Sequence, residues 1–235
     1  PPTSPRLNCR RQRQMCIRDS GSTKGTWLDV GRITGPVADA IQQVGTFLTH
    51  IPELEAARSK AVPVHPLYAS YPNHVPLQVT KVYAGGWGYQ VPIAVPEEGR
   101  VEIIMNAMPG ETREEVLAQL DAWVDSIVER YPDVFPTKPE QRFRLRWMLP
   151  TAMDPDHEFV RMLEETAGEV LGSPPPVLGA PYACDMFALQ RIFGMPSVLF
   201  GPTGGQAHSH DEYIELDTLF QFFETTCAFV LRWCG

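Results

Sequence analysis

The spacing of apolar residues before position 150 predicts two amphipathic helices. The first opens near Pro36, and its apolar residues are Val37, Ile41, Val44, Leu48 and Ile51. Pro52 lacks the backbone N–H that a helix interior uses, so we expect it to break or kink this helix. The second helix follows Thr112 and Glu115, which match a capping box. Its expected core residues are Val116, Leu120, Trp123, Val124 and Ile127.

Alternating apolar and polar residues predict strands over residues 77–83, 100–107 and 142–147. The order helix, strand, strand, helix, strand suits a sheet that two helices cover on one side. A further strand expected before residue 33 would make this sheet four-stranded.

A second unit is expected over residues 150–235. Asp156 is predicted to cap its first helix, which Gly172 ends. The apolar run 197–200 is predicted to be a buried strand, because a strand covered on both faces need not alternate. Asp217 is predicted to cap a last helix, whose expected core residues are Leu219, Phe222, Phe223, Thr226, Phe229, Val230 and Trp233.

The head of the chain, residues 1–20, differs in composition from the rest. It contains five arginines and one acid, although the whole chain has a formal net charge of −8. It has no helical or strand periodicity, and it lacks the apolar core of a secretory signal. It resembles translated adapter sequence; a transit peptide and an RNA-binding arm are the alternatives. We therefore expect a non-native or disordered head, a junction over residues 21–32, and a missing native N-terminal part.

Charge and composition argue against two classes of partner. Binding to nucleic acid over a broad surface needs a basic excess, so we expect no nucleic-acid partner. No apolar run reaches the roughly 18–20 residues of a membrane helix, so we expect no membrane partner. The five cysteines do not suggest a disulfide framework, which favours a reducing compartment and a cytoplasmic protein.

The loop after the run 197–200 is the best candidate for chemistry. It gathers His208, His210, Asp211 and Glu212 within five residues. Ligands collect where the strands of α/β sheets end, and an imidazole there can bind a divalent metal while a carboxylate holds its other nitrogen. A polar surface turn without a ligand is the alternative, since a zinc site needs at least three protein ligands.

Two other kinds of site are less well supported in the same region. Gly204 and Gly205 could cradle a phosphate, but the sequence has neither GxxxxGK[ST] nor GxGxxG here. A sharp turn or a close backbone approach explains these glycines better. Cys184 and His208 could form a nucleophilic thiolate pair, although buried inert cysteines are much commoner.

Several short motifs, in this order and spacing, resemble one enzyme family. They are Gly85-Gly86-Trp87, Pro109-Gly110-Glu111-Thr112, the Asp185 segment with Gly194-Met195-Pro196, Phe200-Gly201-Pro202, Ala207-His208 and Asp211-Glu212-Tyr213. Residues 33–235 thereby resemble the zinc-dependent family of acetylornithine deacetylase, succinyl-diaminopimelate desuccinylase and aminoacylase. The resemblance implies an α/β fold. Residues 33–149 would be an inserted α+β lid that commonly makes a homodimer contact, and residues 150–235 would be the C-terminal part of an α/β metallohydrolase catalytic domain.

The resemblance also implies roles for individual residues. His208 matches the C-terminal metal-ligand histidine of the family, and Glu212 matches the acid of the same motif, where it would support the loop. Asp185, Gly201 and Thr203 would bind substrate. The other metal ligands and the general-base glutamate of the family lie upstream and are not found here, so no catalytic residue is expected in this chain.

The implied chemistry is attack on an amide carbonyl by water held between two Zn²⁺ ions, with Co²⁺ or Mn²⁺ as alternative metals. The implied substrates are N-acyl amino acids or small peptides, cleaved by a deacetylase or metallopeptidase. Two features depart from the family pattern. Asn106 stands where many members carry a carboxylate-binding arginine, and the histidine that many lids place before their first helix is absent.

We therefore expect a truncated enzyme that is inactive by itself and binds zinc poorly. Its partial catalytic domain is expected to expose apolar surface that the missing half would cover. The alternative is a non-catalytic dimerisation or binding module of the same fold.

Overall fold

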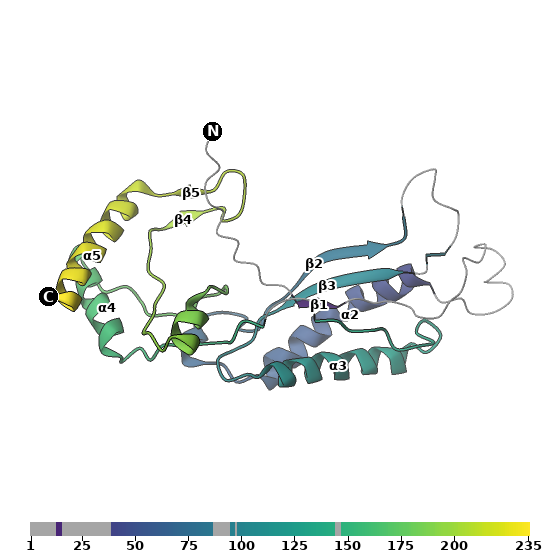
Figure 1. Ribbon diagram of the computed structural model, residues 1–235. Coiled ribbons are helices and arrows are strands. Elements are labelled where there is room, and N and C mark those ends of the chain that lie inside the picture. Colours follow the sequence, from purple (N-terminus) through teal and green to yellow (C-terminus); the bar gives the residue numbers. More distant parts are fainter. Residues whose placement is uncertain (1–12, 16–38, 87–94, 97, 144–146) are drawn as a thin grey trace. The chain divides into compact units, whose positions relative to one another are not determined.

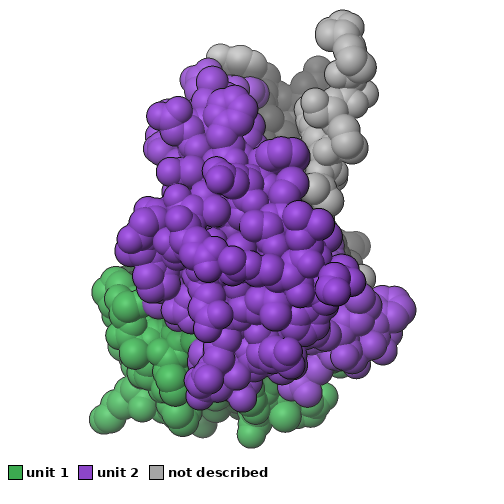
Figure 2. All heavy atoms as spheres, turned by 90° about the vertical axis from the view of Figure 1, so that its left-hand side faces the viewer, with its two compact units in different colours: residues 1–150 green, residues 151–235 purple. Residues whose placement is uncertain are grey.

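The computed structural model describes residues 13–15, 39–86, 95–96, 98–143 and 147–235. The chain divides into two compact units, residues 1–150 and residues 151–235, drawn in green and purple in Figure 2. The junction 21–32, the helix start near Pro36 and Trp87 lie outside the described residues.

Unit 1 contains a three-stranded antiparallel sheet in the order β1-β3-β2 (Figure 1). Its strands are β1 (Arg13–Met15), β2 (Leu77–Ala84) and β3 (Gly99–Met105). The two longer strands confirm two of the predicted ones. β1 belongs to the head, whose non-native origin stays a prediction.

The predicted strand over residues 142–147 is not found in the part of it that the structure describes. Residues 142, 143 and 147 have no regular secondary structure, and residues 144–146 lie outside the described residues. A strand needs a neighbour to pair with its backbone groups, and alternation in the sequence does not supply one.

Helix α2 (Ala40–Ala61) follows Asp39. Asp39 has an extended backbone, and its carboxylate accepts hydrogen bonds from the N–H groups of Ile41 (2.8 Å) and Gln42 (3.3 Å). This side-chain cap satisfies two donors that the first turn leaves free.

The sequence predicts that Pro52 breaks or kinks this helix; the break is wrong, because α2 continues through the proline, and the kink stays a prediction. Ile51 and Leu54, on either side of the proline, are both buried in the core of unit 1. Burial of these side chains offsets the hydrogen bond that proline cannot make.

Helix α3 (Arg113–Arg130) confirms the capping box. Thr112 Oγ1 accepts a hydrogen bond from the Glu115 N–H at 3.2 Å, and the Glu115 carboxylate accepts one from the Thr112 N–H at 2.7 Å. The five predicted core residues of this helix are all buried. They pack with α2 and with Val101, Ile103 and Met105 of β3, so both helices cover the same side of the sheet (Figure 1).

Unit 2 contains two long helices, α4 (Glu158–Leu171) and α5 (Leu216–Cys234), and a short π-helix, η2 (Ala188–Ile192). Phe159 of α4 packs edge-on against Phe229 and Trp233 of α5, with ring centroids 5.1 Å apart in both pairs. Among the described residues, no helix combines the length and hydropathy that crossing a bilayer requires.

Two predicted caps in unit 2 are wrong by one or two residues. His157, not Asp156, caps α4 and accepts a hydrogen bond from the Phe159 N–H at 3.1 Å. Asp156 instead pairs with Arg161 at 2.5 Å. At the other end Gly172 terminates α4 with φ +83°, as predicted. Helix α5 begins after Glu215, which places Asp217 in the first turn, where its negative charge still favours the helix dipole.

The run 197–200 does not form the predicted buried strand. The described strands of unit 2 are only β4 (Gly204–Gly205) and β5 (Tyr213–Ile214). Ser197 is buried, but Leu199 is 48% exposed. No described strand pairs with this run, so its backbone lacks the partner that a strand requires.

Unit 2 buries few apolar side chains. The buried ones are Val160, Ala167, Phe187 and Phe229. The predicted core residues of α5 are therefore only partly correct: Phe229 is buried, whereas Phe223 is 68% and Val230 48% exposed. The expected exposed apolar surface is present.

Candidate functional site

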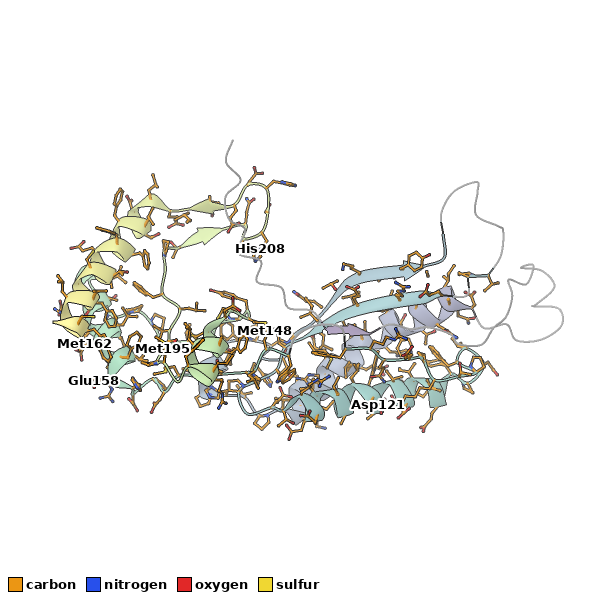
Figure 3. The ribbon with its side chains drawn as sticks, in the orientation of Figure 1. Asp121, Met148, Glu158, Met162, Met195 and His208 are labelled. Carbon is orange, nitrogen blue, oxygen red and sulfur yellow. The ribbon has the colours of Figure 1, made fainter. Side chains whose placement is uncertain are left out.

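His208 lies in the loop between β4 and β5 (Figure 3). The two strands pair antiparallel, with Gly204 opposite Ile214 and Gly205 opposite Tyr213. A Cβ at Gly205 would lie 2.7 Å from the hydroxyl oxygen of Tyr213, and one at Gly204 would overlap the Tyr213 carbonyl oxygen. The glycines therefore allow a close approach between strands, which favours that interpretation over a phosphate cradle.

The loop holds His208 in an unusual backbone conformation. Its φ is +68°, a left-handed region that non-glycine residues rarely adopt. The N–H of His208 donates a hydrogen bond to the Glu212 carboxylate at 3.2 Å. Glu212 thus contacts the backbone of His208. The imidazole of His208 is not used in this hydrogen bond and stays available to a ligand from outside the loop.

The four polar residues of this loop do not form a metal site by themselves. His208, His210, Asp211 and Glu212 are all exposed. Among the residues that the structure describes, no group of three or more histidine, cysteine, aspartate or glutamate side chains could hold a metal ion. An imidazole is a suitable zinc ligand in kind, but the described residues are too few to complete a site.

Thr203 connects the hairpin to the start of α5. Its hydroxyl donates to the Glu215 carboxylate at 2.9 Å, and its N–H donates to the Thr218 hydroxyl at 3.0 Å. Its carbonyl oxygen accepts a hydrogen bond from the Glu215 N–H at 3.0 Å. The first turn of α5 therefore fixes the position from which the His208 loop departs.

The other two residues predicted to bind substrate are exposed. Gly201 has no neighbour within 4 Å of where a Cβ would stand. Asp185 lies before η2, where its carbonyl oxygen accepts a hydrogen bond from the Ala188 N–H at 2.9 Å. Their proposed contact with substrate stays a prediction.

A buried ion pair in unit 1 was missed from the sequence. Arg58 is 1% exposed, and its guanidinium donates to the Glu111 carboxylate at 3.1 Å, to the Asn106 carbonyl oxygen at 2.9 Å and to Gln119. Glu111 also accepts a hydrogen bond from the Met108 N–H at 2.7 Å. The pair fixes the turn that follows β3. The available signal was spacing, because Arg58 continues the buried side of α2 four residues after Leu54.

A second polar group joins the two helices of unit 1. The ring nitrogens of His50 lie 2.6 Å from the Glu53 carboxylate and 2.8 Å from the Tyr131 hydroxyl. Arg130 donates to Glu53 at 2.7 Å. The hydrogen bond from Arg130, and then that from His50, lower the pKa of Glu53 from 4.5 to about 2. His50 thus links α2 to the end of α3.

A cavity of about 460 Å³ opens between β3 and α3 in unit 1. Its lining is mixed: it includes apolar residues of both elements, and Arg113, whose guanidinium lies 4.6 Å from the centre of the Phe143 ring. None of the five residues predicted as site residues lines it.

Solved structures share this fold at low sequence identity. The di-peptidase Dug1p from Saccharomyces cerevisiae is similar with a TM-score of 0.64 and 14% identity, over 94% of this chain and 53% of that one. An amidase of the hydantoinase/carbamoylase family from Burkholderia phymatum has a TM-score of 0.59 and 13% identity, over 94% and 47%. Human carnosine dipeptidase 1 has a TM-score of 0.53 and 13% identity, over 94% and 55%. This chain thus spans about half the length of these structures.

No curated protein sequence matches this chain at a significant level. The profile of peptidase family M20/M25/M40, in contrast, matches residues 30–232, which include most of unit 1 and almost all of unit 2 with the complete His208 loop. The chain therefore belongs to peptidase family M20/M25/M40 and has an α/β fold.

Proposed function

We propose that this chain is the C-terminal part of a metal-dependent amide hydrolase that acts on N-acyl amino acids or small peptides. The observation that carries the proposal is the family match over residues 30–232. The names of the structural neighbours, two dipeptidases and an amidase, support cleavage of an amide or peptide bond. Within the family, the motifs favour the group of acetylornithine deacetylase, succinyl-diaminopimelate desuccinylase and aminoacylase.

In this proposal His208 is a metal ligand. Its exposed imidazole and its backbone hydrogen bond to Glu212 at 3.2 Å support that role. Glu212 positions the loop and leaves the ring free to bind. In the complete enzyme His208 would be one of the residues that hold a pair of zinc ions, or Co²⁺ or Mn²⁺ in their place, and the metals would supply an activated water for attack on the amide carbonyl.

The substrate is proposed to bind beside the same loop. Thr203 is held beside the hairpin by its hydrogen bonds to Glu215 and Thr218. Gly201 leaves open space, and Asp185 has an exposed side chain. The general-base glutamate and the remaining metal ligands are proposed to lie in an upstream part of a longer polypeptide. The 235-residue chain alone is then inactive and binds zinc poorly.

The test uses the longer gene product, meaning the product of the complete natural reading frame that includes this chain. We expect His208→Ala to lower its metal content and to reduce hydrolysis of N-acyl amino acids at least about 100-fold, because a lost ligand empties part of the site. His210→Ala, two residues away in the same loop, is the matched control and should retain both. Unchanged metal content and turnover in His208→Ala would remove His208 from the site.

We also propose that unit 1 forms a homodimer through one edge. β2 is the outer strand of the described sheet, and Val79 and Val82 are 40% and 49% exposed. Both lie opposite buried residues of β3, on the side that the helices cover. An outer strand with exposed apolar residues favours pairing with another strand.

Helix α2 adds an apolar row beside that edge. Ile41, Gly45, Leu48 and Pro52 share one side of the helix, at intervals of four, three and four residues. Glu55 continues this row and accepts a hydrogen bond from the Leu77 N–H of β2 at 2.7 Å, so the row lies on the β2 side of the helix. A two-fold axis beside β2 would pair β2 with the β2 of a second copy, and the apolar row of α2 with the same row of that copy.

Light scattering of the longer gene product tests the dimer. The double variant Ile41→Lys/Val82→Lys should shift the mass from dimer to monomer, since it places charges in the contact. Val64→Lys, at a residue that is 53% exposed and off this surface, should stay dimeric. A dimer without turnover or bound metal would favour the alternative function, a non-catalytic dimerisation or binding module.

We further propose a cytoplasmic location, since Cys184, Cys227 and Cys234 are free thiols.

A further inference from the structure

Three side chains of unit 1 connect a hydroxyl, an imidazole and a carboxylate through hydrogen bonds. Nε2 of His50 lies 2.8 Å from the Tyr131 hydroxyl, and Nδ1 of the same ring lies 2.6 Å from a carboxylate oxygen of Glu53. Both distances are within the normal range or shorter. This group, here called the Tyr131 triad, has the order of nucleophile, base and orienting acid that activates a hydroxyl group for attack.

The carboxylate decides which ring nitrogen of His50 carries the hydrogen. The hydrogen bonds from Arg130, and then from His50, lower the pKa of Glu53 to about 2, so its carboxylate is ionised and only accepts hydrogen bonds. Nδ1 of His50 must therefore be the donor, and in the neutral ring Nε2 keeps a lone pair. The Tyr131 hydroxyl then donates to Nε2, which is the direction in which a base removes a proton.

Neighbouring contacts hold the triad in place. Glu53 follows His50 by three residues in α2, and side chains at this spacing lie on the same side of a helix. The Arg130 guanidinium donates to Glu53 at 2.7 Å and to the Ser126 carbonyl oxygen at 3.2 Å. It also lies 5.8 Å from the centre of the Tyr131 ring, where its charge favours negative charge that develops on the tyrosine oxygen.

A second tyrosine–histidine pair of unit 1 has the opposite arrangement. The rings of Tyr68 and His65 meet edge-on with centroids 6.2 Å apart, and Nδ1 of His65 accepts a hydrogen bond from the Leu67 N–H at 3.3 Å. Because Nδ1 is the acceptor here, the neutral ring carries its hydrogen on Nε2, which then cannot take up a proton. Tyr68 and Tyr131 are both partly buried. Tyr68 is therefore a matched internal control for Tyr131.

We propose that Tyr131 is an acyl-accepting site, at which His50 acts as the base and the substrate is an activated acyl ester. The Tyr131 oxygen forms a bond to the acyl carbon, and its proton passes to Nε2 of His50 and then to solvent. The bond between the acyl carbon and the leaving oxygen breaks, and the leaving group departs with the electron pair. The product is an ester of Tyr131. All three side chains belong to unit 1, so this reaction is independent of the proposed metal site.

Acetylation of the 235-residue chain by p-nitrophenyl acetate tests the proposal. Release of p-nitrophenolate follows the reaction in time, and mass spectrometry of the peptides locates the acetyl group. Tyr131 should be acetylated about 100-fold faster than Tyr68, which is the lower end of what a positioned base contributes. Acetylation of both tyrosines at the same rate would overturn the proposal.

Variants separate the base from the nucleophile. His50→Gln removes the base and should lower the acetylation rate of Tyr131 to that of Tyr68, whereas His65→Gln is the matched control and should leave Tyr131 unchanged. Tyr131→Phe keeps the ring and should abolish the fast release of p-nitrophenolate, so the test does not depend on the folding of His50→Gln alone. Fast release that persists in Tyr131→Phe would show direct attack by another group and would overturn the proposal.

Glu53 is a positioning residue in this proposal, because it acts through the ring of His50. Glu53→Ala should lower the acetylation rate of Tyr131, and Glu53→Gln, which keeps an acceptor oxygen for the Nδ1–H group, should recover part of the rate. Both variants lose the ion pair with Arg130, so a purely structural role would make their rates equal. Equal rates in these two variants would contradict the positioning role. None of the variants changes His208, so failure of the metal proposal is distinguishable from failure of this one.

Discussion

The guanidinium of Arg58 lies 3.1 Å from the carboxylate of Glu111, and the two side chains are only 1% and 10% exposed. Arg58 extends from α2, whereas Glu111 belongs to the turn between β3 and α3. The pair therefore connects a helix to a turn 53 residues later. Both charges are withdrawn from water, so each depends on the other for compensation.

Arg58→Met should destabilise unit 1 by about 3–5 kcal/mol, because it leaves the Glu111 carboxylate buried without its partner. The measurement is the midpoint of urea unfolding. Lys81→Met is the matched control, since Lys81 is 61% exposed and pairs with Glu102 at 3.0 Å. Exposed pairs contribute about 1 kcal/mol or less. Equal losses of unfolding free energy in the two variants would show that the buried Arg58–Glu111 pair contributes no more to stability than an exposed ion pair does.

The lowered pKa of Glu53 predicts that the free energy of unfolding depends on pH. The hydrogen bonds from Arg130 and His50 lower this pKa from 4.5 to about 2 in the folded chain. A carboxyl with a lowered folded pKa contributes stability that is present above pH 4.5 and disappears as the pH falls towards 2. The stability difference between the natural chain and Glu53→Gln should therefore shrink over that interval. A difference that stays constant from pH 6 to pH 2 would contradict the assignment.

The β4–β5 hairpin predicts different outcomes for its two glycines. Gly205→Ala should open the hairpin because its Cβ meets the Tyr213 ring at 2.7–2.8 Å, and Tyr213→Ala should relieve this clash. Gly204→Ala meets the Tyr213 backbone instead, so the same second substitution should not rescue it. Limited proteolysis within residues 206–212 reports the opening. Gly201→Ala, with no neighbour within 4 Å, is the control that should behave like the natural chain.

The cap of α3 predicts a smaller, local effect. Thr112→Ala removes the acceptor for the Glu115 N–H and should cost about 1 kcal/mol of unfolding free energy. Thr112→Ser keeps the hydroxyl and should restore most of it. The backbone N–H of Thr112, and then its hydroxyl, lower the pKa of Glu115. Because Thr112→Ala removes only the hydroxyl, that pKa should move part of the way back towards 4.5 in an NMR titration. Equal stability of the alanine and serine variants would contradict the cap.

Features that depend on residues close together in the chain could be predicted from the sequence. The capping box uses Thr112 and Glu115, which are three residues apart, and the buried side of α3 follows from helical spacing alone. Gly172 ends α4 as predicted. In these cases the partner groups lie within one or two helical turns. The wider family was indicated by the order and spacing of several short motifs along the chain, which can be read without the fold.

Only the tertiary structure decided the features whose partners are distant in the chain. The run 197–200 has the residues of a strand, but a strand forms only where another strand satisfies its backbone. Pro52 sits inside a continuous helix because the core of unit 1 holds the residues around it. Helical spacing places Arg58 on the buried side of α2, but its partner Glu111, 53 residues later, could be recognised only from the tertiary structure. Which side of α5 meets α4 likewise depends on packing, because the sequence makes both sides apolar and spacing alone does not rank them.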